Sequence, residues 1–229
     1  MNVMKGKSNF FIQDSSLYIE ITDLSDILNY KDVIDNSIEN DVINVLAIIW
    51  NGQDIFSSLN HEEKLDLYRW LDLLPILSVI VVNNYCYGDL LELFMICDIR
   101  IGGSNLVISF PYDDSEFIFN FKERCKLLMG KQEVKGGYES LLKKTFHSKE
   151  IYKLRLINQI IDMEDMSNQV QKYINKVINS KSSYQIKAIM KCFNNYKNLG
   201  LNNNRELLLE QEFIQFCNLI TKEFFKKRL

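Results

Sequence analysis

The stretch NNYCYGDLLELFMICDIRI, residues 83–101, decides how this sequence is interpreted. It is apolar almost throughout, yet Gly88, Asp89 and Glu92 stand together near its front. The residues from Asp89 to about Cys97 are predicted to form a helix, because they are apolar over two to three turns after a glycine. The two acids either begin a buried helix or face a reacting group.

Upstream of this stretch, two continuous apolar runs of strand length stand at 42–50 (VINVLAIIW) and 77–83 (LSVIVVN). Strands that are apolar on every residue are typical of a parallel sheet covered on both faces. The segment 60–75 between them has leucines at helical spacing and ends at a proline, so the unit is predicted to be strand, helix, strand. The segment SSLYIEI, 15–21, alternates as a half-buried strand does.

Downstream, the segment IRIGGSNLVISFP, 99–111, is predicted to hold two short strands separated by glycines. From about residue 121 the pattern is expected to be helical to the end, with long amphipathic segments at 181–200 and 206–229. The sequence therefore predicts an α/β core over residues 1–160 and a C-terminal helical region over 161–229.

Composition excludes several classes of protein. A chain of 229 residues, 47% of them hydrophobic, can bury a large core. The net charge is −3 and the lysines are spread, so nucleic acid is not an expected partner. The five cysteines lack metal-ligand spacing and are interpreted as reduced thiols, mostly in apolar runs, so no metal site is predicted. The start does not resemble a signal peptide and no run has the length of a membrane span, so a cytoplasmic protein without a membrane partner is expected.

The residues from Leu74 to Ile101 resemble the crotonase, or enoyl-CoA hydratase/isomerase, superfamily. The matched positions of the family pattern are Asn83, Gly88, Glu92, Leu93 and the run Cys97, Asp98, Ile99 and Arg100. The segments 45–60, 104–111 and 146–161 also look like family segments. The resemblance implies a crotonase-like ββα spiral with a C-terminal helical region, assembled as a homotrimer or a hexamer.

The resemblance also implies a substrate class, an acyl thioester of coenzyme A or of an acyl carrier protein. No separate cofactor is expected, because coenzyme A or phosphopantetheine is part of the substrate. Carried over by position, the backbone N–H groups of Asn60 and Asp89 would form the oxyanion hole that holds the thioester oxygen. Gly88 and Ser58 are expected to contact the substrate.

Glu92 falls at the position of one of the two glutamates used by hydratases of this family. Tyr112 stands where the second would be, and a tyrosine is a poor base at neutral pH, so two-glutamate hydration is not expected. Acids within 113–116 could supply a carboxylate nearby. His61 with Tyr112 loosely resembles the histidine and tyrosine pair of some decarboxylases in the superfamily, so these two and Glu92 are the candidate catalytic residues.

Several positions depart from the family pattern. Asn84, Asp89 and Leu90 stand where the family has glycines, and Leu59 replaces the glycine before the first N–H donor. The substrate site is therefore expected to be narrower or differently shaped. Three functions remain open: lyase or isomerase chemistry, for example in polyketide or other secondary metabolism; decarboxylation of a malonyl-type or glutaconyl-type thioester; and an inactive subunit that supports a partner enzyme.

Structural interpretations of the same residues also remain open. Asp89 could be an N-cap with Glu92 completing a capping box. His61 could be a polar loop residue, and Tyr112 could be an aromatic wall of a pocket. In the segment around His147, a helix start is predicted, with Ser148 as the cap.

Overall fold

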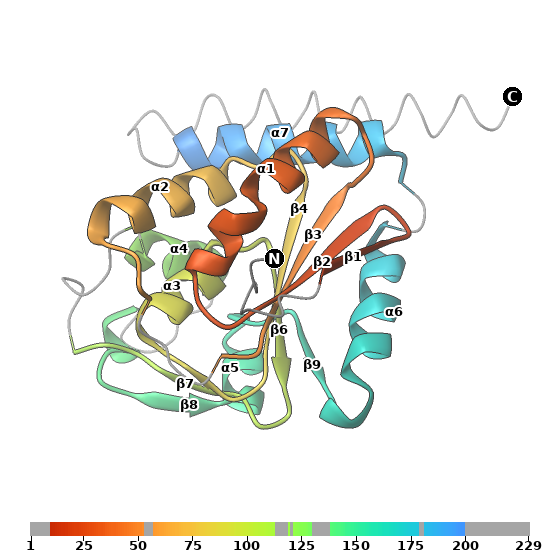
Figure 1. Ribbon diagram of the computed structural model, residues 1–229. Coiled ribbons are helices and arrows are strands. Elements are labelled where there is room, and N and C mark those ends of the chain that lie inside the picture. Colours follow the sequence, from red (N-terminus) through yellow and green to blue (C-terminus); the bar gives the residue numbers. More distant parts are fainter. Residues whose placement is uncertain are drawn as a thin grey trace, which may run out of the picture. The chain divides into compact units, whose positions relative to one another are not determined.

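The computed structural model describes residues 10–52, 57–112, 119, 121–129, 138–178 and 181–199. The chain divides into two units, Met1–Ser180 and Lys181–Leu229. The described elements of the first unit (Figure 1) are, in chain order, β1 (Phe10–Gln13), β2 (Ser16–Ile21), α1 (Ser25–Glu39), β3 (Val45–Trp50), α2 (His61–Asp72), β4 (Leu77–Val82), β5 (Tyr85–Cys86), α3 (Gly88–Ile96), β6 (Ile99–Gly103), β7 (Val107–Ser109), α4 (Phe121–Met129), η2 (Tyr138–Ser140), β8 (Thr145–His147), α5 (Ser148–Lys153), β9 (Gln159–Ile161), η3 (Met163–Asp165) and α6 (Met166–Ile178).

The strands form two sheets. The larger has the order β1-β2-β3-β4-β6-β9, in which β1 is antiparallel to β2 and every other neighbouring pair is parallel. The smaller has the order β5-β7-β8, with β5 and β7 parallel and β7 and β8 antiparallel. The predicted parallel pair with a helix between its strands is confirmed as β3, α2 and β4.

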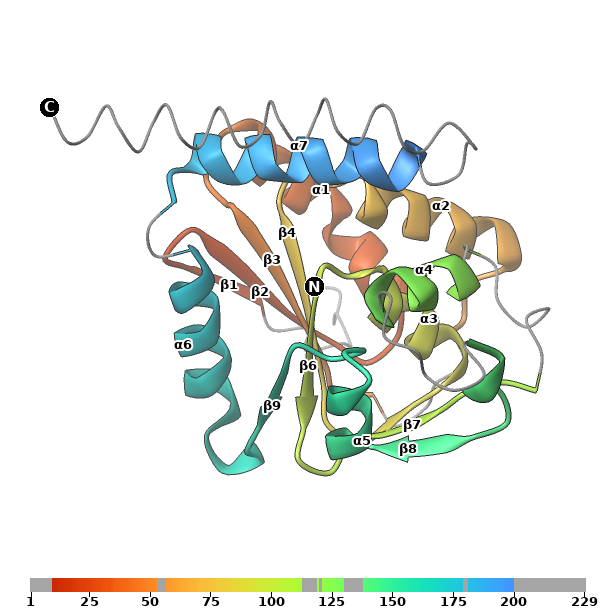
Figure 2. The same ribbon diagram turned by 180° about the vertical axis from the view of Figure 1, so that it is seen from behind.

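The central strands β3 and β4 are apolar at every residue except Ser78, because both faces of the larger sheet are covered. In β4, Ile80 and Val82 lie in the core on one face, whereas Val79 and Val81 lie in the core on the opposite face. Val170 of α6 packs in this second core. Figures 1 and 2 show α6 on the other side of the sheet from α1, α2 and α3.

The segment that leads from the larger sheet toward α3 is held by a close backbone approach. Asn83 directly follows β4, and Gly103 ends the neighbouring parallel strand β6. A Cβ atom on Gly103 would lie 2.1 Å from Asn83 Oδ1 and 3.0 Å from its Cα. Only glycine leaves room here, because real Cβ atoms essentially never come within 3.0 Å of another heavy atom.

Beyond residue 121, the expectation of helices alone is wrong. The strands β8 and β9 lie in this part of the chain, and β9 extends the larger sheet by pairing with β6. Each has only three residues, too few to show a periodic pattern. The helix start near residue 148 is confirmed as α5, but its N-cap is His147, and the predicted cap, Ser148, is its first residue.

In the second unit, the described element is α7 (Ser183–Leu199), which confirms the first of the two helices predicted there. Ser182 and Gln185 cap its start reciprocally: Ser182 N donates to Gln185 Oε1 at 2.8 Å, and Gln185 N donates to Ser182 Oγ at 3.3 Å. The second helix predicted, over 206–229, lies outside the described residues.

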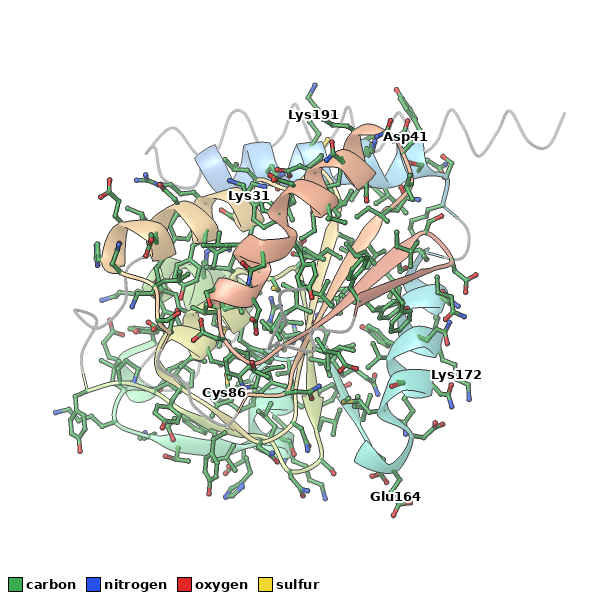
Figure 3. The ribbon with its side chains drawn as sticks, viewed as in Figure 1. Lys31, Asp41, Cys86, Glu164, Lys172 and Lys191 are labelled. Atoms are coloured by element: carbon green, nitrogen blue, oxygen red, sulfur yellow. The ribbon has the colours of Figure 1, made fainter. Side chains whose placement is uncertain are left out.

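Two predictions about side-chain environment can be compared with the described residues. Cys86 (Figure 3) and Cys97 are reduced and almost fully buried, as predicted for core residues. Burial raises the pKa of the Cys86 thiol well above its usual value, which keeps it protonated and unreactive. Among the described helices, none is both long enough and apolar enough to cross a membrane.

Candidate functional site

The helix α3 begins at Gly88, one residue before Asp89. Its N-cap is Tyr87, which makes no capping bond with its side chain, and Gly88 is the first helical residue. Gly88 has φ 55°, a left-handed conformation that costs glycine little and other residues more. Asp89 therefore lies in the first turn, where the N–H groups have no partner within the helix and the helix carries a partial positive charge.

The capping-box interpretation of Asp89 and Glu92 is wrong. Asp89 is not the N-cap, and its side chain turns away from the start of its own helix toward Ser57 and Lys64. The Glu92 side chain accepts a hydrogen bond from Phe119 N, far along the chain. These two acids make tertiary contacts, which their spacing in the sequence does not indicate.

The loop 57–60, before α2, uses all four of its backbone N–H groups internally. The bonds are Ser57 N to Asp89 Oδ2 at 3.2 Å, Ser58 N to Asp23 Oδ2 at 3.2 Å, Leu59 N to Ser57 Oγ at 3.1 Å, and Asn60 N to Glu63 Oε2 at 2.9 Å. Three of the four acceptors are carboxylates. The backbone N–H groups of this loop therefore bind mainly carboxylates.

Asp23 anchors this loop from the segment between β2 and α1. Its carboxylate accepts from the Ser58 hydroxyl at 3.0 Å and from Ser25 N at 2.8 Å, besides the Ser58 N–H. Burial alone would raise the pKa of Asp23, but the hydrogen bonds from Ser25 and Ser58 outweigh it and lower the pKa below its ordinary value. Ser58, predicted to contact the substrate, is committed to Asp23 in this structure.

The Asp89 carboxylate joins α2, α3 and the loop. Lys64 Nζ of α2 lies 3.0 Å from Asp89 Oδ1 and 3.2 Å from Oδ2, and both side chains are partly exposed, at 18% and 17%. One turn along α2, the Tyr68 hydroxyl donates to the Asp89 carbonyl oxygen at 3.1 Å. Lys64 and Tyr68 together therefore fix both the side chain and the backbone of Asp89.

Glu92 lies one turn after Asp89 and is almost completely buried, at 1% exposed. The buried Tyr68 has a raised pKa, caused mainly by burial and then by the negative charges of Glu92 and Asp89. The structure thus gathers Lys64 and Tyr68 of α2 with Asp89 and Glu92 of α3 into one polar cluster. It borders the apolar core to which Leu67 and Leu71 of α2 and the leucines of α3 contribute.

The other two candidate catalytic residues lie at the surface. His61 is the exposed first residue of α2. Tyr112 is 73% exposed, and Lys143 Nζ lies 5.7 Å from the centroid of its ring. The acids proposed within 113–116 lie outside the described residues. The roles predicted for His61 and Tyr112 therefore stay predictions.

Comparison with known proteins finds matches by structure but none by sequence. No family model matches this sequence, and no curated protein matches it. Solved structures, by contrast, match over nearly the whole length of both chains. DspI from Pseudomonas aeruginosa is 16% identical, with a TM-score of 0.73, covering 97% of this chain and 95% of that one.

Two further matches carry more descriptive names. An enoyl-CoA hydratase/isomerase family protein from Silicibacter pomeroyi is 14% identical, with a TM-score of 0.71, covering 95% of this chain and 99% of that one. An enoyl-CoA hydratase from Bacillus halodurans is 20% identical, with a TM-score of 0.65, covering 97% and 98%. This chain has the crotonase fold.

The crotonase fold was predicted from residues 74–101, and these residues form β4, β5, α3 and the first part of β6. Within that fold, α3 and the loop 57–60 are linked directly by the hydrogen bond between Ser57 N and the Asp89 carboxylate. The two segments that resemble the donor segments of the family are therefore neighbours. A group bound between them would meet backbone N–H donors and a helix N-terminus.

Sequence reasoning missed three polar residues of this crotonase-fold site: Asp23, Lys64 and Tyr68. Tyr68 is buried with Leu67 and Leu71 on the apolar side of α2, and that position does not indicate the bond that its hydroxyl makes. Lys64 stands four residues before Tyr68, and this spacing places both on one helix face, so the signal was present. Asp23 has no comparable signal, because only the folded chain brings it to Ser58.

Proposed function

We propose that this chain binds an acyl thioester, carried on coenzyme A or on an acyl carrier protein, and acts on it by stabilising an enolate. The observation that carries this proposal is the direct link between the loop 57–60 and the start of α3. A thioester oxygen that gains negative charge needs two N–H donors from separate segments, and these two segments meet. The named similarities to enoyl-CoA hydratases point to the same substrate class.

The two proposed donors are the N–H groups of Asp89 and Asn60. Asp89 N belongs to the first turn of α3, and Asn60 N donates to Glu63 in the structure. A helix cap is worth about 1 kcal/mol, whereas a single oxyanion donor is worth about 3 kcal/mol in a transition state. An enolate that develops on the thioester can therefore displace the exposed Glu63 carboxylate from the Asn60 N–H at a net gain, which is realised in the transition state.

Asp89 itself does not oppose an enolate as strongly as its charge suggests. Its carboxylate is paired with Lys64, so the first turn of α3 carries a neutralised acid rather than a lone negative charge. Glu92 is the proposed acid, base or orienting group, because it is a buried carboxylate one turn further along the same helix. With Tyr112 at the second glutamate position, isomerisation or decarboxylation is favoured over two-glutamate hydration.

A second candidate function is a non-catalytic subunit with the same fold. The observation that favours it is the internal use of all four N–H groups in the loop 57–60. If the internal acceptors stay in place, the thioester oxygen has no donor from that loop. Such a protein would support a partner enzyme, while keeping the crotonase fold and the trimeric assembly that this fold suggests.

One experiment separates the two candidates. The full chain is incubated with enoyl-, malonyl- and glutaconyl-type thioesters of coenzyme A and of an acyl carrier protein, and product masses are followed over time. For an enzyme, we expect a mass change or an isomer separable by chromatography, and Glu92→Gln should slow turnover by about 100-fold or more. Glu164→Gln is the matched control, because Glu164 is exposed beside α6 (Figure 3) and should leave turnover unchanged.

The outcomes are distinct. Turnover that survives Glu92→Gln at the full rate contradicts the role proposed for Glu92. Thioester binding without turnover supports the non-catalytic subunit. Absence of both binding and turnover contradicts the proposed acyl-thioester function and supports the non-catalytic subunit.

A further inference from the structure

The Asp89 carboxylate is held mainly by groups outside its own helix. Three donor contacts converge on it: Ser57 N at 3.2 Å, and Lys64 Nζ at 3.0 and 3.2 Å to its two oxygens. A backbone N–H and an ammonium group arranged in this way form a carboxylate-binding site. In this structure the chain's own side chain fills that site.

A ligand group that takes the place of the Asp89 carboxylate would have to be negatively charged. The Lys64 side chain is only 18% exposed, so its ammonium is partly withdrawn from water and needs an anionic partner. A neutral acyl chain at this place would leave Lys64 without a counter-ion. A carboxylate on a ligand would give Lys64 an equivalent counter-ion, and the partly exposed Asp89 carboxylate would turn to solvent, where water hydrates and screens its charge.

The position of Asp89 sets the size of such a ligand. Its backbone N–H is the proposed donor to the thioester oxygen, and its carboxylate carbon is three bonds from that nitrogen. A ligand whose thioester oxygen meets Asp89 N–H can therefore bring a carboxylate near Lys64 only if the acyl chain is short. Malonyl and succinyl groups have this size.

We propose that Lys64 and the Ser57 N–H bind a carboxylate on the acyl group of the substrate, and that Asp89 occupies this subsite when no substrate is bound. The protein then selects short carboxylated acyl thioesters over neutral ones of the same length. Asp89 is the residue that sets this selectivity, because a neutral acyl group has no means of displacing it. This inference rests on the proposed thioester function and names its substrate class.

The test compares malonyl-CoA with acetyl-CoA, which share the coenzyme and differ by one carboxylate. Their affinities are measured by calorimetry for the unchanged protein, Lys64→Met and Asp89→Ala. We expect malonyl-CoA to bind about tenfold more tightly than acetyl-CoA, a difference of about 1.4 kcal/mol. Lys64→Met should abolish the preference by weakening malonyl-CoA binding more than acetyl-CoA binding, whereas Asp89→Ala should strengthen malonyl-CoA binding severalfold.

Two matched controls test for general effects of charge. Lys172→Met removes an ammonium from α6, and Asp41→Asn removes a carboxylate beyond the end of α1 (Figure 3), so neither should change the preference. Equal affinity for both thioesters in the unchanged protein overturns the inference and leaves the proposed function intact. Parallel losses of both affinities in Asp89→Ala would also overturn it, since they indicate a structural role.

A second measurement does not depend on thioester binding. In Asp89→Ala the vacated subsite should accept free malonate, so malonate should raise the melting temperature of this variant more than sodium chloride at equal ionic strength. The double variant with Lys64→Met should lose this effect. If Asp89→Ala shows no malonate-specific stabilisation, the inference is wrong, even if thioesters bind. If malonate stabilises it but no thioester binds, only the proposed function fails.

Discussion

The two helix starts beside the candidate site are built in opposite ways. At α2, Asn60 Oδ1 accepts from Glu63 N at 3.0 Å, and Glu63 accepts from Asn60 N at 2.9 Å, so the start is closed by its own residues. At α3, Tyr87 gives no side-chain cap, Gly88 is left-handed, and Asp89 bonds to residues of α2 and of the loop. The first start is local, whereas the second depends on the rest of the fold.

The comparison teaches where a binding site can form. A helix start that is already capped has fewer spare donors, and a ligand that uses a capped N–H must displace the cap. A start held open by tertiary contacts keeps its first-turn N–H groups available to a ligand. Substitutions that disturb the tertiary contacts should therefore affect α3 more than α2.

The largest effect is expected from Gly103→Ala, which disturbs the segment leading toward α3. The added Cβ would meet the Oδ1 and Cα atoms of Asn83, so we expect a loss of about 1–3 kcal/mol in the free energy of unfolding, measured by urea denaturation. In a double-mutant cycle, Asn83→Ala should recover part of this loss, because it removes the clash with the side-chain oxygen but leaves the clash with the backbone. A loss no larger in Gly103→Ala than in an exposed surface variant would contradict the close approach.

The next effect is expected at Gly88, the first residue of α3. Gly88→Ala should cost about 1–2 kcal/mol, because alanine is strained at φ 55°. Gly88→Asn should cost less, since asparagine adopts the left-handed region more readily. Equal losses for alanine and asparagine, measured by thermal unfolding, would show that the backbone angle is not the cause.

The α2 start should show the smaller loss expected of a local cap. Asn60→Ala removes the acceptor for Glu63 N and should cost about 1 kcal/mol in the free energy of unfolding. The matched control is Asn36→Ala in the exposed interior of α1, where alanine is the better helix former and stability should rise slightly. Two changes of the same sign would mean that capping does not explain the result.

The smallest effect is expected in the pH dependence of stability that arises from Asp23. This residue holds the loop 57–60, which lies between the two helix starts. Hydrogen bonds from Ser25 and Ser58 lower its folded-state pKa below the ordinary value of 3.8. The unfolded chain therefore binds the proton more readily, so the stabilisation is present above pH 3.8 and is lost as the pH falls through the folded-state pKa. Asp23→Asn should flatten the acid limb of a plot of melting temperature against pH, and unchanged limbs would contradict this.

Ser58→Ala sharpens the same measurement. It removes the hydroxyl donor to Asp23 but keeps the backbone donor, so the acid limb should lie between those of the unchanged protein and Asp23→Asn. An acid limb identical to that of Asp23→Asn would mean that the hydroxyl alone lowers the pKa of Asp23.

The fold is predictable where the sequence pattern is long and regular. The apolar runs that form β3 and β4, and the pattern that forms α3, can be recognised from the sequence alone. The helix α1 was not predicted, although its buried Ile27, Tyr30, Ile34 and Ile38 stand at helical spacing. The three-residue strands β8 and β9 were missed because their pairing partners are far away in the sequence.

For the candidate site, the sequence indicated the segments but not the contacts. By itself, the apolar pattern of the sequence determined the helix after Gly88 and the strands that flank it, and the resemblance of residues 74–101 to the crotonase family indicated the spiral fold. Only the tertiary structure decided that the Asp89 carboxylate meets Lys64 of another helix, and that Glu92 bonds to Phe119 rather than capping its own helix. Local patterns set backbone conformation, whereas the direction of a charged side chain depends on which donors the folded chain brings within hydrogen-bonding distance.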